Sequence, residues 1–573
     1  MNYRKQIGLG LLVVLLLAAG GWLFMRRTER IEMATYVPES AIGYLEIQNL
    51  PQLLSQMTST KAWQQLAPAY GISDTLGFIG QASRFGWLAD LAGSDELALL
   101  SEAQIAVVIT SLEARNEAIK PRMALVAETH GRAGTLRSLV EKRLPEMAEK
   151  LFGQSSRQAG EYSGVQVISF AAPNTERKLL AAQIESELIL ANHEEPLHAC
   201  IDARLGRKPS LVNNPHLFQA RPAVGAGASV FGFVNSEGVK RLLRLGTYLA
   251  AGGVVGKAVL AGAVGEVFTD FSGKTCDGIA YGWSFEEGQV VDRYAVLFKP
   301  DLTEKLKTII TAGTGEAQAL GLIPAAASEV TLIKVANPSK TLDGIETVIS
   351  SRVDVAQSFL LHQFAIGMRE AAFGAKSGEL TGAAIGDEIA SFNLTGEPQD
   401  RVWLVAVRDR TMMTRLAETV LTQFQNKRVT SIHRENIEGV EILNSGEPSR
   451  GSAIFLSEFL AFGRRAQLIR LIEAYRHGQS LKSAPLFVSA GRVSASAPLL
   501  SVSSVKEESG EMMAALARAF GQNAAPADAG ILNQLPLAIS ATSLNDQGLA
   551  IESHSPFGNF PFFVSLFDGS TNR

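Results

Sequence analysis

The chain has 573 residues, of which 46% are hydrophobic and 19% charged, and its 53 Lys and Arg against 57 Asp and Glu give a net charge of -4. This length exceeds what one hydrophobic core usually serves, so several domains are expected, and the apolar content excludes a disordered chain. The near-neutral charge offers no overall attraction for nucleic acid, so a nucleic-acid partner is not expected.

The first element is an uncharged apolar run from Ile7 to Met25, which follows a short basic head, residues 1–6. A helix of that length is close to the roughly 30 Å hydrocarbon thickness of a bilayer. The run therefore predicts a single-pass transmembrane anchor with a cytoplasmic head and an exported body. A signal peptide cleaved after the small residues 18–20 is the alternative. Basic residues flank the run on both sides, so the orientation stays open.

The next segments alternate between strand and helix patterns. Aliphatic runs between polar residues predict strands at 41–48, 104–109 and 123–128. Residues 135–152 carry apolar side chains at helical spacing, with a kink expected at Pro145. Strands mixed with helices and joined by short turns favour an α+β fold with a largely antiparallel sheet.

The stretch HEEPLHAC, residues 193–200, concentrates histidine, glutamate and cysteine. Its two histidines, His193 and His198, are weak metal candidates, because they lie five apart with a proline between them, unlike the zinc-protease helix. Acidic residues and Pro196 instead suit a helix start after a strand at 186–192, and Gly206 suits the helix end. We therefore interpret the stretch as a helix start that buries Cys200. A Cys200–Cys276 disulfide stays open, and no cofactor is expected.

Two long parts of the sequence read alike. Residues 186–218 resemble 457–487, residues 162–168 resemble 437–443, and 121–144 resemble 400–421 in the same order. This order predicts a tandem duplication with a first α+β domain at 37–310, a linker at 311–322 and a second α+β domain at 323–573. In the alignment, His193, His198 and Cys200 stand over Arg464, Ile469 and Leu471.

Two further features could mark contact surfaces. The segment 245–268 is rich in Gly, Ala and Val, and Lys257 divides it into runs too short to cross a bilayer. It predicts either helices packed inside the domain or an exposed apolar surface for a partner or the membrane, with Val254, Val259 and Val264 as contact residues. Arg464 and Arg465 at a helix start could hold an anion, and a solvated pair is the alternative.

The N-terminal part of the chain, mainly residues 1–65, carries a resemblance. The apolar run followed by VPESAIGYLEIQNLPQLLSQMTSTKAW, residues 37–63, resembles the opening of a family of bacterial envelope proteins catalogued only as a domain of unknown function. The resemblance implies a single-pass protein of the bacterial inner membrane with a periplasmic α+β body. It implies no catalytic residues.

Function is expected from how the two copies differ. The copies differ at nearly every ionisable position, so what they have in common is the packing of their cores. A catalytic site common to both copies is therefore not expected. We therefore expect a non-enzymatic, membrane-anchored envelope protein that binds a partner protein or an apolar ligand, or serves as an accessory subunit of a membrane assembly. An extracytoplasmic hydrolase or metalloenzyme with a dispersed site is the alternative.

Overall fold

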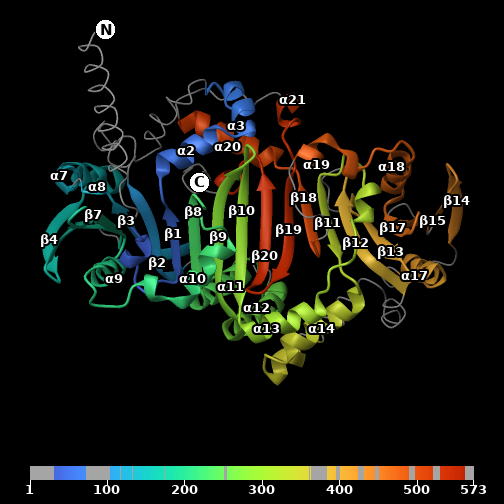
Figure 1. Cartoon of the computed structure of the whole chain (residues 1–573), viewed down its shortest axis with the longest axis horizontal. Helices are drawn as coiled ribbons and strands as arrows, with labels where there is room; N and C mark the ends of the chain where they lie inside the picture. Colours follow the sequence, from blue (N-terminus) through green and yellow to red (C-terminus); the bar gives the residue numbers. More distant parts are fainter. Residues whose placement is uncertain are drawn as a thin grey trace, which may run out of the picture.

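The structure is a computed structural model, and its secondary structure is built around one large sheet. It describes residues 31–72, 103–115, 118–131, 133–173, 176–250, 255–359, 362, 384–394, 400–423, 432–444, 451–489, 497–519 and 529–561. These residues form a single antiparallel sheet of 20 strands, with helices along both long sides of the molecule (Figure 1).

The first half of the sheet contains strands β1 to β10. Its elements are β1 (Gly43–Ile47), α2 (Leu50–Thr58), α3 (Lys61–Leu66), β2 (Gln104–Arg115), β3 (Ala118–Glu128), α7 (Ala133–Ser138), α8 (Leu144–Phe152), β4 (Ser156–Tyr162), β5 (Val165–Ala171), β6 (Lys178–Ile184), β7 (Glu187–Ala191), α9 (Glu194–Arg204), α10 (Pro215–Ala223), β8 (Val230–Asn235), α11 (Ser236–Ala250), α12 (Val255–Thr275), β9 (Cys276–Glu286), β10 (Gln289–Phe298) and the following α13 (Pro300–Ile309).

The second half contains strands β11 to β20. Its elements are β11 (Glu329–Lys334), α14 (Pro338–Ser350), β12 (Ile385–Asn393), β13 (Val402–Val407), α17 (Arg410–Gln423), β14 (His433–Ile437), β15 (Val440–Asn444), β16 (Ser452–Leu456), β17 (Phe459–Gly463), α18 (Arg465–Arg476), α19 (Pro485–Ser489), β18 (Leu499–Ser503), α20 (Lys506–Ala519), α21 (Ala529–Leu532), β19 (Ala538–Asn545) and β20 (Gly548–Ser555).

The two halves of the sheet have the same strand order, read from each end toward the centre. From one end to the centre the order is β4-β5-β6-β7-β3-β2-β1-β8-β9-β10. From the other end it is β14-β15-β16-β17-β13-β12-β11-β18-β19-β20. The halves meet where β10 pairs antiparallel with β20, from Val290 opposite Ser555 to Leu297 opposite Gly548. Antiparallel pairing of corresponding strands relates the halves by an approximate twofold rotation.

This architecture corrects the expected fold of two tandem domains with separate sheets. The sheet continues across the chain because β10 and β20 pair, which satisfies backbone N–H and C=O groups that would otherwise be free at two sheet edges. Helices of both halves also share a core, where Trp63 of α3 packs with Met513 and Leu516 of α20 and with Phe557 after β20. The domain boundary at 311–322 stays a prediction.

The predicted anchor, residues 7–25, lies outside the described residues. In the part of the chain that the structure describes, no helix has the length and apolar character needed to cross a membrane. This finding conflicts with the single-pass transmembrane fold and the inner-membrane location expected from the sequence, and both expectations are corrected here.

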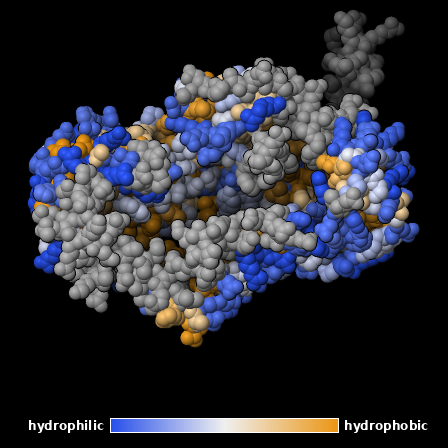
Figure 2. All heavy atoms as spheres, turned by 180° about the vertical axis from the view of Figure 1, so that it is seen from behind, coloured by the Kyte–Doolittle hydropathy of each residue, from blue (hydrophilic) through white to orange (hydrophobic). Residues whose placement is uncertain are grey.

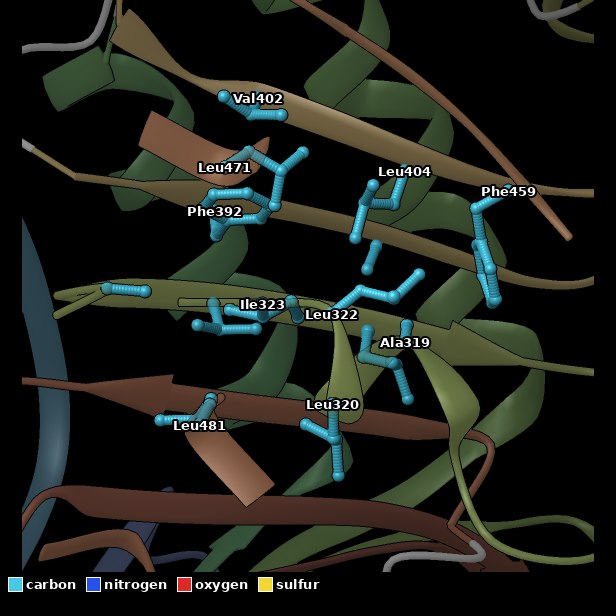
Figure 3. Close-up of a cluster of buried hydrophobic side chains, with 14 of the residues drawn as sticks. Ala319, Leu320, Leu322, Ile323, Phe392, Val402, Leu404, Phe459, Leu471 and Leu481 are labelled. Carbon is cyan, nitrogen blue, oxygen red and sulfur yellow. The ribbon is translucent and has the colours of Figure 1, made fainter. Parts of the chain in front are cut away.

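Each half buries its own apolar face of the sheet beneath helices. In the second half, Phe392 of β12 and Val402 and Leu404 of β13 pack with Leu471 of α18 and with Leu481 (Figure 3). Alternate residues of a strand point to the same face, so Val402 and Leu404 lie together. Seen from behind, the ends of the molecule are mainly hydrophilic, whereas apolar side chains are visible in the hollow between them (Figure 2).

Several local predictions from the sequence are confirmed. The strand expected at 186–192 is β7, and the helix that follows it is α9, which ends before Gly206 in the left-handed region at φ 68°. The helix expected at 135–152 is interrupted, because a π-helical turn (Leu139–Arg143) separates α7 from α8 and Pro145 lies in the first turn of α8.

Candidate functional site

The stretch HEEPLHAC lies beside a surface pocket of the first half. The pocket has a volume of about 630 Å³ and lies between the Pro38 turn, the end of β4, the start of α9 and the Lys208–Pro209 segment. Small-molecule sites usually measure about 300 to 1,000 Å³, so this pocket has a suitable size. Its polar and aromatic lining consists of Glu39, Ser40, Tyr162, His193, Glu194, Glu195, His198 and Lys208.

A stacked pair of rings forms one part of the lining. The rings of Tyr162 and His198 are 3.7 Å apart between centroids and inclined by 9°. Tyr162 is held at the end of β4 by a tight hairpin turn, in which Ser163 and Gly164 take φ values of 60° and 84°. Its hydroxyl donates to Asp202 Oδ2 at 3.1 Å, which fixes the tyrosine further. The pair is therefore set by the fold before any ligand binds.

His193 has a structural role at the start of α9. Its Nδ1 accepts a hydrogen bond from the Glu195 backbone N–H at 3.3 Å, which caps the helix. The cap therefore occupies the Nδ1 atom of His193, whereas His198 lies further along the helix against Tyr162. Over the described ranges, no group of three or more His, Cys, Asp or Glu side chains is placed to hold a metal ion.

The rim of the pocket is acidic. Glu194 pairs with Lys178 at 2.9 Å, and this hydrogen bond lowers the pKa of Glu194. Glu195 accepts from the Thr110 hydroxyl at 2.7 Å. The cation at the rim, Lys208, is matched by Asp202 at 2.9 Å. Glu39 is exposed and has no ion-pair partner among the side chains that the structure describes, so the rim keeps negative charge.

In the second half, apolar residues replace Glu39 and both stacked rings, whereas Arg464 takes the position of His193. The Pro38–Ser210 bridge corresponds to the Pro324–Ser480 bridge, so Ala325 occupies the position of Glu39 in the second half. The β14–β15 turn corresponds to the β4–β5 turn, so Ile437 occupies the position of Tyr162. Ile469 follows the buried Leu468 of α18 as His198 follows the buried Leu197 of α9, and both isoleucines pack on the core. The ring pair therefore distinguishes the first half.

The other predicted contact residues do not line this pocket. Arg464 pairs with Asp400 at 3.0 Å, and Arg465 forms a two-pronged contact with Glu435 at 2.5 and 3.1 Å. Carboxylates of the same chain thus take the place of the predicted anion. Val254 lies outside the described residues, and Val259 and Val264 belong to α12, which packs beside α11. Their role as a contact surface stays a prediction.

Both cysteines are free and buried. Burial raises the pKa of Cys200 to about 12 and that of Cys276 to about 11, so both remain thiols near neutral pH. The open question of a Cys200–Cys276 disulfide is thereby answered in this structure, where the two thiols are not joined.

Sequence reasoning found the histidines but missed Glu39, Tyr162 and Lys208. The alignment of the two copies already held a usable signal, because it pairs Tyr162 with Ile437 and His198 with Ile469, an aromatic residue with an aliphatic one each time. Comparison with protein-family models, curated proteins and solved structures finds no match to this chain. The resemblance of residues 1–65 to an envelope family therefore stays a prediction.

Proposed function

We propose that this chain is a non-enzymatic binding protein whose first-half pocket binds a small organic cation with a flat ring. The observation that carries the proposal is the Tyr162–His198 stack, which lines a pocket of about 630 Å³ where the second half has Ile437 and Ile469. Two isoleucines fill the corresponding positions of the second-half core, so stacked rings are not required for packing there.

The ligand class follows from the chemistry of the lining. An aromatic face attracts a flat ring by stacking and a cation through its quadrupole, each worth about 0.5 to 2 kcal/mol. Among the described side chains Glu39 has no ion-pair partner, and Glu195 accepts from the Thr110 hydroxyl, so the acidic rim favours positive charge on the ligand. A ring-bearing amine satisfies both features of the pocket.

Tryptamine is a suitable probe, because it combines a flat ring with an ammonium group. Typical ligand efficiencies of roughly 0.3 to 0.5 kcal/mol per heavy atom predict a Kd between about 2 mM and 40 µM. Calorimetry and ligand-observed NMR would compare tryptamine with butylamine, which lacks the ring, and with indole-3-acetate, which reverses the charge. Tryptamine is expected to bind most tightly of the three.

The matched variant replaces both rings with the residues of the second half. Tyr162→Ile with His198→Ile is expected to fold and to weaken tryptamine binding about tenfold. Tyr475→Ile, at another partly exposed tyrosine, is the control and should leave binding unchanged. Equal binding of all three probes, or full binding by the double variant, would refute the proposal. Zinc binding that depends on His193 and His198 would favour the metal alternative instead.

A further inference from the structure

A second pocket lies in the second half, at a different corner of the sheet. It has a volume of about 330 Å³ at the ends of β11, β12, β13 and β17. The side chains that matter for its chemistry are Lys334, Asp387, Glu388, Val407, Arg408 and Glu458. Both signs of charge therefore meet in one small cavity.

The floor of this pocket is a buried ion pair. Lys334 Nζ lies 2.9 Å from Glu388 Oε1, and both side chains are only 2–3% exposed. Glu388 also accepts from the backbone N–H groups of Gln318 and Ala319, each at 2.9 Å, so its charge is fully matched. Lys334 donates to the Glu316 carbonyl at 2.7 Å as well. Among the residues that the structure describes, these two contacts engage two of the three ammonium hydrogens.

The rim carries charges that are not matched. Arg408 and Glu458 are exposed and Asp387 is half-buried. Within the described part of the chain, none of these three side chains forms an ion pair, although all three line the cavity. A simple cation would leave Arg408 unmatched, and a simple anion would leave the two carboxylates unmatched.

The same corner of the first half holds larger polar side chains that bond to one another. Glu128 and Glu187 face each other across β3 and β7, as Ala406 and Phe459 do across β13 and β17. There, Tyr36 donates to Glu128 at 3.1 Å and Arg204 donates to Glu187 at 3.0 Å. In the second half the smaller Ala406 stands at the position of Glu128, which leaves room for the pocket there.

We propose that this second-half pocket binds a free amino acid through its zwitterionic backbone group. The ligand carboxylate binds Arg408 and the remaining Lys334 hydrogen, and the ligand ammonium binds Asp387 and Glu458. Val407, which is half-buried in the lining, supplies an apolar surface for the ligand side chain. This site is separate from the first-half pocket and does not depend on the function proposed for it.

Leucine is the probe, and two analogues each lack one of its charges. Calorimetry on the full chain would compare leucine with leucinamide, which lacks the carboxylate, and with 4-methylpentanoate, which lacks the ammonium. Leucine is expected to bind at least about tenfold more tightly than either analogue, because each analogue leaves one sign of charge unpaired. Leucinamide binding as tightly as leucine would overturn the proposal in favour of a plain cation site, and absence of binding by all three would also overturn it.

Variants at the exposed rim test the same site without disturbing the core. Arg408→Gln and Glu458→Gln are each expected to weaken leucine binding about tenfold while the unfolding curve stays unchanged. Arg415→Gln, at an exposed arginine outside the pocket lining, is the control. The Tyr162→Ile, His198→Ile variant should keep leucine binding, which separates this proposal from the first. Leucine binding that survives both rim substitutions would refute the assignment.

Discussion

Arg293 of β10 and Glu552 of β20 lie opposite each other at the centre of the sheet, with Arg293 Nε 2.8 Å from Glu552 Oε2. Strand registers place them at corresponding positions, because Arg293 pairs with Gly282 of β9 as Glu552 pairs with Ala541 of β19. The pair therefore lies at the approximate twofold axis that relates the two halves. In a dimer of identical chains, a charged residue at a twofold axis would lie opposite its own copy, and two like charges would meet. Here the two positions carry opposite charges instead.

Glu552 makes stability sensitive to acid. The hydrogen bond with His554 and then that with Arg293 lower the pKa of Glu552 to about 2, against an opposing effect of burial. A lowered folded-state pKa contributes stability above about pH 4.5 that is lost as the pH falls toward 2. Because the Glu552 side chain is 42% exposed, we expect Glu552→Gln to cost only about 1 kcal/mol at pH 7.

Urea unfolding from pH 7 to pH 2.5 measures this effect, with Glu304→Gln on the exposed face of α13 as the control. The difference between wild type and Glu552→Gln should shrink as the pH falls. A difference that is constant with pH would contradict the role of the Glu552 charge.

Charge reversal tests the central pair directly. Arg293→Glu and Glu552→Arg each place like charges opposite one another, so each should destabilise the protein more than Glu552→Gln does. The double swap restores opposite charges and should recover part of the loss, giving a coupling energy on the order of 1 kcal/mol. The contacts of Arg293 with Glu286 and Ser284 limit the recovery. Additive single effects would show that the pair is not coupled.

Asp292, next to Arg293 on the other face, has the opposite pH dependence. Tyr281 donates to its carboxylate at 2.6 Å, but burial dominates and raises the pKa of Asp292 to about 6. A raised folded-state pKa contributes stability below about pH 3.8 that is lost as the pH rises through 6. Asp292→Asn keeps the acceptor for Tyr281 and removes the buried charge.

We therefore expect Asp292→Asn to be more stable than wild type at pH 7.5, by roughly 2 to 3 kcal/mol, and nearly equal at pH 4. Denaturant unfolding at the two pH values measures both. Equal stability at pH 7.5 would mean that the carboxylate is ionised without cost.

Removing one partner of the buried Lys334–Glu388 pair should cost far more stability than removing one partner of a surface pair. Lys334→Met leaves Glu388 buried without its cation, so we expect a loss of about 3 to 5 kcal/mol. Lys482→Met removes the exposed partner of Glu316 and should cost less than about 1 kcal/mol. The free energies of unfolding of the two variants provide the comparison, and similar losses would argue against a buried pair.

Local features of the fold could be predicted from the sequence, and long-range pairing could not. The strand β7 and the helix α9 follow from signals within a few residues, such as the acidic helix start and Gly206. The pairing of β10 with β20 joins residues from opposite halves, and nothing within 289–298 distinguishes an edge strand from a central one. For that reason the sequence predicted two separate sheets.

The candidate pocket shows the same limit. The sequence identified His193 and His198 by their residue types. Tyr162 reaches His198 only because the turn after β4 and the start of α9 meet in the folded chain. Which face of α9 is exposed to solvent depends on how the helix packs against that turn.

The shared core beneath α3 and α20 has a consequence for biosynthesis. Trp63, Trp283 and Val290 belong to the first half, but they are covered by Met513, Leu516 and Phe557, which are made more than two hundred residues later. At about 5 to 20 residues per second, a ribosome needs roughly 10 to 50 s to supply that cover. During this interval the nascent first half presents two tryptophans and the open edge of β10, so chaperones that shield apolar surface should engage the chain before its synthesis ends.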